Sequence, residues 1–131
     1  MKLKNVFGLI IIVLACFLDC SDTNDQSNND LVVYKEGDIE ITFLDIRDSR
    51  CPINAVCIWQ GNAEVDLSIK NSVDTVDFTL NTAGFLNDSL NFPSSAIIFD
   101  LNIELLNVQP FPEDGKSFKL EDYTVSISVT K

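Results

Sequence analysis

Apolar and polar residues alternate along most of the chain after residue 30, and this period of two constrains the fold more than any other feature. Successive side chains of a β-strand point to opposite faces, so the pattern is typical of a strand with one face in the core and one in water. Five segments show it, at residues 39–43, 63–70, 76–80, 99–105 and 123–129. No amphipathic helix pattern stands out between them. The sequence therefore predicts half-buried antiparallel strands.

Turn-forming residues separate these segments, at positions 36–38, 60–62, 82–84 and 112–115. Proline presets one turn dihedral angle and glycine accepts a positive φ, so these clusters mark places where the chain reverses. About seven short strands at this spacing predict an all-β fold, a single antiparallel β-sandwich, with an immunoglobulin-like sandwich or a small barrel as alternatives. We expect one domain over residues 31–131, a size that can form a modest core.

The first residues of the chain have the pattern of a targeting segment. Lys2 and Lys4 precede an uncharged run from Val6 to Leu18. This run is shorter than the roughly 20 apolar residues that cross a bilayer as a helix. A cleaved secretory signal is therefore a better interpretation than a permanent transmembrane span.

Two cysteines at the end of this run predict a bacterial lipoprotein. Lipoprotein processing requires a small residue before the cysteine that receives the lipid, and Ala15 precedes Cys16 whereas Asp19 precedes Cys20. We therefore expect residues 1–15 to be the signal peptide and Cys16 to carry the acyl chains, palmitate included. Cys20 is the alternative, because anchoring there would leave an even number of cysteines in the mature chain. An ordinary cleaved signal without lipid is the third option.

Residues 16–30 continue the chain as a polar segment. From Ser21 to Asp30 there is no apolar side chain, so the segment cannot bury enough surface to offset the entropy of ordering. We expect a disordered tether that holds the domain to a membrane of the bacterial cell envelope through the N-terminal lipid. In a Gram-negative cell this would be the outer membrane. Several acyl chains together anchor firmly, whereas one binds only marginally.

Charge and histidine content narrow the functions. The chain has 20 acidic and 9 basic side chains, a formal net charge of −11, so nucleic acid is not an expected partner. Histidine is absent, which removes the usual general base, the Ser-His and Cys-His pairs and the commonest transition-metal ligand. We expect no catalytic residues, no metal and no cofactor, and hence no enzyme. A carboxylate pair of the kind that glycosidases use is the remaining catalytic option.

Residues 48–63 contain the one distinctive constellation. Cys51, Pro52, Cys57 and the only tryptophan, Trp59, lie within it. In an oxidising envelope, Cys51 and Cys57 predict a disulfide that closes a loop between two strands. Zinc would find two thiolates and no histidine to complete a tetrahedral site, so a disulfide is the better interpretation.

The Asp-Ser-Arg-Cys-Pro, Cys-x-Trp-x-Gly pattern of residues 48–61 resembles a family of uncharacterised bacterial secreted proteins and lipoproteins. Members of that family often have a later Leu-x-x-Val-x-Pro-aromatic-Pro stretch, similar to residues 105–112, and a closing strand that opens with tyrosine, as at Tyr123. The resemblance extends over about residues 38–131. It implies an exported protein and carries no established activity.

Four residues in and beside the loop are candidates for binding, namely Arg50, Ile53, Asn54 and Trp59. Loops on β scaffolds carry binding sites, and tryptophan and arginine dominate binding hot spots. A structural interpretation competes with this one. In it, Trp59 plugs the end of the sandwich against the disulfide, and Arg50 pairs with Asp48 or Asp45.

Two other features have predicted places. Residues 81–92 predict a long exposed loop and a second binding surface. Tyr123 predicts a core aromatic residue whose hydroxyl group bonds to the backbone.

Two functions follow. The first is a non-enzymatic binding or interaction module for an unidentified envelope protein or ligand. The alternative is an inhibitor of an envelope protease or glycosidase that inserts the 51–57 loop into a cleft, because a rigid loop loses little entropy on binding. The exposure of residues 53–55 distinguishes them, since a projecting ridge favours inhibition and a loop that lies flat favours a structural staple.

Overall fold

The structure is a computed structural model that describes residues 31–83, 85–86 and 91–131. The predicted signal peptide (1–15), the tether (16–30), and both candidate lipid-attachment sites, Cys16 and Cys20, lie outside these ranges. No helix within them is long and apolar enough to cross a membrane.

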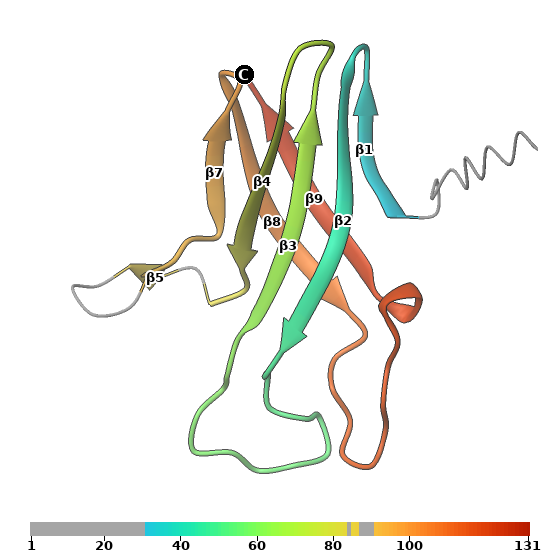
Figure 1. The fold of residues 1–131 in the computed structure, drawn as a ribbon. Helices are drawn as coiled ribbons and strands as arrows, with labels where there is room; N and C mark the ends of the chain where they lie inside the picture. The colour runs from blue at the N-terminus through green and yellow to red at the C-terminus, as the bar shows by residue number, and fades with distance from the viewer. Residues whose placement is uncertain (1–30, 84, 87–90) are drawn as a thin grey trace, which may run out of the picture.

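The described chain folds into two antiparallel sheets that stack on each other (Figure 1). The first has the order β1-β2-β3-β4 and contains β1 (Val32–Glu36), β2 (Ile39–Asp48), β3 (Ala63–Lys70) and β4 (Thr75–Asn81). The second has the order β7-β8-β9 and contains β7 (Ser95–Ile98), β8 (Leu101–Gln109) and β9 (Thr124–Thr130). A short pair, β5 (Phe85–Leu86) and β6 (Asn91–Phe92), connects them, and a 3-10 turn (Leu120–Asp122) precedes β9. The predicted all-β sandwich is confirmed.

Each sheet is a meander in which neighbouring strands follow one another along the chain. An immunoglobulin-type sandwich uses Greek-key connections instead. The edges of the two sheets approach each other where β4 meets β7 and where β1 meets β9. No ladder joins the two sheets among the described strands, so the fold is a sandwich of two meanders and not a closed barrel.

The core lies between the sheets and is made by the inward face of each strand. On β3 every second residue is buried from Ala63 to Ile69, as the alternation predicts. The largest fully buried side chains are Phe43, Ile41, Leu67, Ile69, Leu80, Ile103, Val65 and Val108. Burial of this apolar surface is the main favourable term in folding the domain.

Two irregularities of register turn large apolar side chains outward. The pairing shifts between Phe43 and Asp45 in β2, and between Leu105 and Asn107 in β8. A β-bulge adds one residue to a strand and so changes which residues face the core beyond it. Leu106, at the second bulge, is therefore 61% exposed although Leu105 beside it is buried.

Residues 81–92 differ from the expected exposed loop. Asn81 ends β4 and is 3% exposed, and its backbone N–H donates to the Pro93 carbonyl oxygen at 2.8 Å. Part of the segment pairs as β5 and β6. The prediction of a loop exposed throughout is thus wrong at its start, because the polar Asn81 is used inside the domain.

Two long connections meet at one end of the sandwich (Figure 1). Residues 49–62 join β2 to β3, and residues 110–123 join β8 to β9. The opposite end has only short turns, at 37–38, 71–74 and 99–100. The first end holds the four loop residues that the sequence singled out as binding candidates, Arg50, Ile53, Asn54 and Trp59.

Candidate functional site

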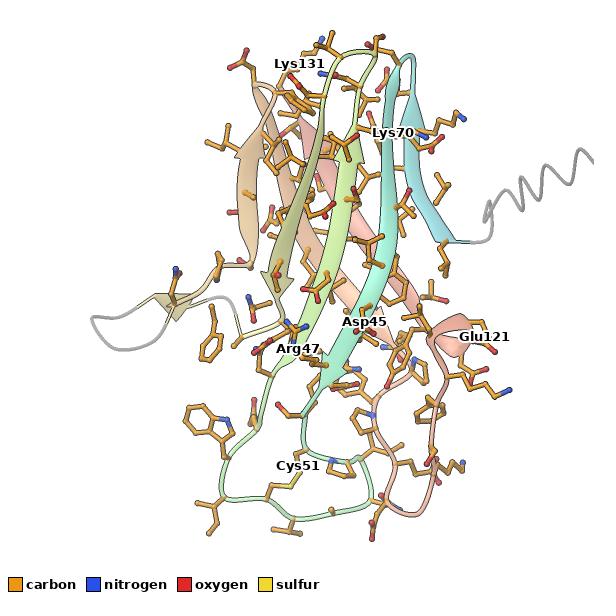
Figure 2. All side chains as sticks on the ribbon, in the orientation of Figure 1. Asp45, Arg47, Cys51, Lys70, Glu121 and Lys131 are labelled. Atoms are coloured by element: carbon orange, nitrogen blue, oxygen red, sulfur yellow. A yellow bond between two sulfur atoms is a disulfide. The ribbon has the colours of Figure 1, made fainter. Side chains whose placement is uncertain are left out.

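The 49–62 connection projects beyond the strands and is closed by the predicted disulfide, which Figure 2 shows at Cys51. Cys51 and Cys57 are bonded, with their Cα atoms 6.0 Å apart. All residues from 53 to 60 are exposed. The loop is therefore a projecting ridge and does not lie flat against a sheet.

The ridge exposes large apolar side chains. Ile53 is 69% exposed, Val56 104%, Ile58 110% and Trp59 64%. No residue from 51 to 62 is charged, in a chain with a net charge of −11. The prediction that Trp59 plugs the end of the sandwich is wrong, because the space beneath the loop is occupied by other groups.

Arg50 is one of those groups. Its guanidinium group lies over the Phe111 ring, 4.3 Å from the ring centroid, in cation–π geometry. Nε donates to Asp48 Oδ1 at 2.8 Å and Nη2 to Asp48 Oδ2 at 2.6 Å. Nη1 donates to the Val108 carbonyl oxygen, and Nη2 also to that of Pro110, both at 2.8 Å. Arg50 pairs with Asp48, as the structural interpretation predicted, and it bonds the two end connections together.

Asp48 also accepts from the Arg50 backbone N–H at 3.1 Å and has a contact with Tyr123. The Tyr123 hydroxyl group lies 3.5 Å from Asp48 Oδ2, so the predicted bond to the backbone is instead a contact with a carboxylate. Burial raises the pKa of Tyr123, and the negative charge of Asp48 raises it further. The phenol therefore stays protonated and able to donate.

Asn54 joins the tips of the two connections. The backbone N–H of Asp114 donates to Asn54 Oδ1 at 2.7 Å, and Asn54 Nδ2 donates to the Asp114 carbonyl oxygen at 3.5 Å. The backbone N–H of Ile53 donates to the Pro112 carbonyl oxygen at 2.9 Å. The Asn54 side-chain amide thus bonds to the backbone of the other connection as a backbone amide of a paired strand would. Of the four candidate residues, Arg50 and Asn54 hold the ridge in place, and Ile53 and Trp59 are exposed on it.

The base of the ridge has one position that only glycine can occupy. Gly61 has a φ of +74°, and a Cβ atom there would lie 1.9 Å from the Ser49 carbonyl oxygen. This close approach allows the Cys51 N–H to donate to the Gln60 carbonyl oxygen, and the Ser49 N–H to that of Asn62, both at 2.8 Å. The β2–β3 pairing thereby continues into the loop.

Asn62 ties the same base to β4. It is 7% exposed, its Nδ2 donates to Asn81 Oδ1 at 2.7 Å, and its Oδ1 accepts from the Ala83 N–H at 3.0 Å. Every buried side-chain nitrogen or oxygen in the described part of the chain has a hydrogen-bond partner. Hydrogen bonds to neighbouring parts of the domain therefore hold the base of the loop in place.

A groove with a volume of about 1080 Å³ lies beside the ridge. The loop forms one wall, and residues 105–108 of β8 with Thr82 and Ala83 form the other. Among the described lining residues the single charged one is Arg50, whose guanidinium group is already bonded. The groove therefore offers no free charged group, and its lining combines apolar side chains with the polar Gln60, Thr82 and Asn107.

Four exposed apolar lining residues were not recognised as candidates from the sequence, namely Val56, Ile58, Leu106 and Phe111. Leu106 is 61% and Phe111 43% exposed, and both line the groove. The doubled Leu105-Leu106, which breaks the alternation, was the available signal for Leu106. Phe111 gave no separate signal, because its place depends on Arg50, which is distant in sequence.

The groove does not offer a free strand edge at Val108. β7 pairs with β8 over Leu101–Glu104. The last hydrogen bond on this side of β8 is the one that the Leu105 N–H donates to the Ser94 carbonyl oxygen. Farther along, the Val108 N–H donates to Asn107 Oδ1 at 2.9 Å and the Val108 carbonyl accepts from Arg50. Both backbone groups of Val108 are used, so the surface favours apolar side-chain contacts over the addition of a strand.

Charged groups gather instead on the outer face of the first sheet. Arg47, labelled in Figure 2, lies 2.7 Å from a Glu64 oxygen and 2.6 Å from an Asp66 oxygen. The Arg47 guanidinium lowers the pKa of Asp66. Hydrogen bonds from Lys35 and Lys70 lower the pKa of Glu40 to about 2. Within the described ranges no three metal-ligating side chains come together.

No family model matches the chain, and no curated protein and no solved structure matches it either. The resemblance of the 48–61 motif to bacterial secreted proteins and lipoproteins thus stays a prediction.

Proposed function

We propose that this protein is a non-enzymatic lipoprotein of the bacterial cell envelope whose β-sandwich is a binding module. Its binding surface is the apolar end, which we define as Ile53, Val56, Ile58, Trp59, Leu106 and Phe111. The observation that carries the proposal is the supported, uncharged ridge that exposes four of these side chains. All six line one groove, whereas apolar residues scattered singly on a surface need no explanation.

The size of the apolar end is sufficient for binding. Burying one large aliphatic or aromatic side chain contributes about 1.5–3 kcal/mol, so six provide on the order of 10 kcal/mol. Association opposes this with about 4–15 kcal/mol of lost freedom, part of which is the ordering of loops. The disulfide and the hydrogen bonds of Asn54 order the ridge in advance, so less of that opposing term remains on binding.

The lipoprotein part of the proposal rests on the basic start, the short apolar run and the cysteines that follow it. Intact mass spectrometry of the protein from membranes, with and without reduction, tests it directly. Attached acyl chains support the proposal, and the number of free thiols decides between Cys16 and Cys20. A mature mass without acyl chains would contradict the lipid anchor.

The binding surface is tested by photo-crosslinking in native envelopes. A photoreactive residue at Val56 should form adducts with a protein or a lipid. The matched control is Val73, which is 85% exposed but lies in the β3–β4 turn at the opposite end. Equal adducts from both positions would contradict a binding site at the apolar end.

The inhibitor function has one observation in its favour, the projection of residues 53–55 as a ridge. A panel of envelope proteases and glycosidases assayed with the protein tests it. Inhibition that is lost in Ile53→Asp and kept in Val73→Asp would support it, because a carboxylate at the ridge would have to lose its water in an apolar cleft. Full activity of every enzyme in the panel counts against it.

A further inference from the structure

The ridge differs in charge from the turns at the opposite end of the sandwich. Residues 51–62 at the apolar end carry none, whereas each of the three turns at the opposite end has an acidic residue, Asp38, Asp74 and Asp100. Beside the ridge, Glu113 is paired with Lys116 at 2.6 Å, and Glu121 lies 3.8 Å from Lys119. Asp114 and Asp122 add further negative charge there. The apolar end is thus an uncharged tip on an acidic domain, which suits an uncharged apolar medium and disfavours an anionic one.

Two side chains of the tip, Val56 and Ile58, are almost entirely surrounded by solvent. Val56 and Ile58 are 104% and 110% exposed, as much as in an extended chain. Such side chains gain most from a medium that surrounds them on all sides, as acyl chains do. Trp59 stands next to Ile58, and tryptophan is enriched at membrane interfaces because its ring is apolar and its N–H is polar.

The length of chain before β1 allows the tip to reach the bilayer that holds an anchored N-terminus. β1 begins opposite Thr42, part-way along β2, and runs away from the apolar end (Figure 1). Six residues of β2, about 20 Å, separate Thr42 from the end of that strand, and the loop extends farther. Residues 16–30 span at most about 50 Å when extended. The tip and an acylated Cys16 can therefore reach the same bilayer.

We propose that the apolar end inserts into the headgroup–acyl boundary of the bilayer that holds the lipid anchor, so that the domain is attached at two points. The inference names a lipid surface as the ligand of the proposed binding surface, and it rests on the proposed anchor. A tether raises the effective concentration of the tip at the bilayer, so weak insertion is sufficient. The acidic domain restricts this contact to bilayers rich in zwitterionic headgroups, which have no net charge.

The single tryptophan makes the contact measurable, because all indole emission comes from Trp59. The acylated full-length mature protein is reconstituted into dioleoylphosphatidylcholine vesicles, with and without a dibrominated analogue that quenches indole within the acyl region. We expect brominated lipid to quench Trp59 and aqueous iodide to leave it largely unquenched. Replacing most of the phosphatidylcholine by phosphatidylglycerol should reduce the lipid quenching, because the domain is acidic.

A matched pair of double variants tests the tip itself. Val56→Asp with Ile58→Asp adds two charges at the tip, and Val73→Asp with Ile97→Asp adds two charges at exposed apolar positions elsewhere. Lipid quenching of Trp59 should fall several-fold in the first variant and stay at the wild-type level in the second. Circular dichroism confirms that both are folded.

Each other result overturns the inference. Quenching by iodide without quenching by brominated lipid places Trp59 in water. Protection from both quenchers places it in a protein contact, and equal lipid quenching in the tip variant places it near the bilayer without insertion of the tip. If mass spectrometry shows that the protein lacks acyl chains, the proposed lipid anchor is contradicted, and this result is distinct from a failure of the tip to insert.

Discussion

The buried ion pair of Arg50 and Asp48 should dominate the stability of the apolar end. Their side chains are 6% and 5% exposed. Arg50→Met keeps an unbranched side chain but removes the charge and the donors. Asp48 would then hold a buried charge with only the position-50 N–H, at 3.1 Å, and the Tyr123 hydroxyl group beside it. The Val108 carbonyl oxygen would also lose the arginine donor.

Removing one partner of a buried ion pair costs about 3–5 kcal/mol because the other charge stays uncompensated. A domain of this size has about 5–15 kcal/mol of stability in total, so the change is large. At roughly 4 °C or more per kcal/mol, the melting temperature should fall by at least about 12 °C. The measurements are urea denaturation, for the free energy of unfolding, and thermal denaturation, for the melting temperature, both followed by circular dichroism with the disulfide intact.

Arg47→Met is the matched control. Arg47 also binds two carboxylate groups, but its side chain is 54% exposed on the outer face of the first sheet. Solvent screens exposed pairs, so this variant should lose no more than about 1 kcal/mol. Equal losses in the two variants would refute the reasoning. In the double variant Asp48→Asn with Arg50→Met, part of the stability should return, since no buried charge then remains.

Three further predictions concern the loop and the outer face. Gly61→Ala should lower the free energy of unfolding, measured by urea denaturation, by at least about 3 kcal/mol, and Gly37→Ala by about 1 kcal/mol. Both glycines have a positive φ, but only a Cβ atom at position 61 would clash with the backbone. Equal losses would contradict the clash. Replacing Cys51 and Cys57 by serine should cost about 2 kcal/mol, as expected for closing a short loop, and unchanged stability would argue against the disulfide. Glu40 has a folded-state pKa of about 2 against an ordinary 4.5, so the stability it contributes is present above pH 4.5 and is lost as the pH falls toward 2. Glu40→Gln should make acid denaturation less steep in that window, and an unchanged pH profile would count against the ion pairs.

The longer strands β2, β3, β4, β8 and β9 could be predicted from the sequence because each contains its own stretch of alternating apolar and polar residues. β3 lies between β2 and β4, so its alternation from 63 to 70 is matched by alternating burial. β1 and β7 are edge strands, and residues 32–36 and 95–98 include no fully buried position. Their patterns were correspondingly weak. Their existence follows from pairing with longer strands and not from their own residues.

The bulges could not be placed from the sequence. Leu105 and Leu106 are adjacent and equally apolar, and only one of them can face the core. The choice is made by β9, where Ile127 pairs with Leu105 and Ser126 with Asn107. The outward direction of Leu106, and with it one wall of the groove, is therefore a property of strand pairing.

The candidate site was located by the sequence, but the roles of its residues were only partly predicted. Pairing of Arg50 with Asp48 is local and could be anticipated. The bonds of Arg50 to the Val108 and Pro110 carbonyl groups join residues 58 and 60 positions apart, and those of Asn54 to Asp114 join residues 60 apart. These long-range contacts bury Arg50 and leave Trp59 exposed. The composition of the motif alone therefore could not tell which residues hold the loop in place and which are available for binding.

The division of roles within the loop bears on function. Arg50, Asn54 and Gly61 act on the backbone and hold the ridge, whereas Val56 and Ile58 contact almost nothing in the fold. Side chains exposed in the folded state contribute no burial energy to folding, and an exposed apolar patch raises the tendency to aggregate. A loop that served only as a staple would be at least as stable with polar residues at 56 and 58. The contact outside the domain that we propose would explain their apolar character, and the support beneath them would present that contact in one conformation.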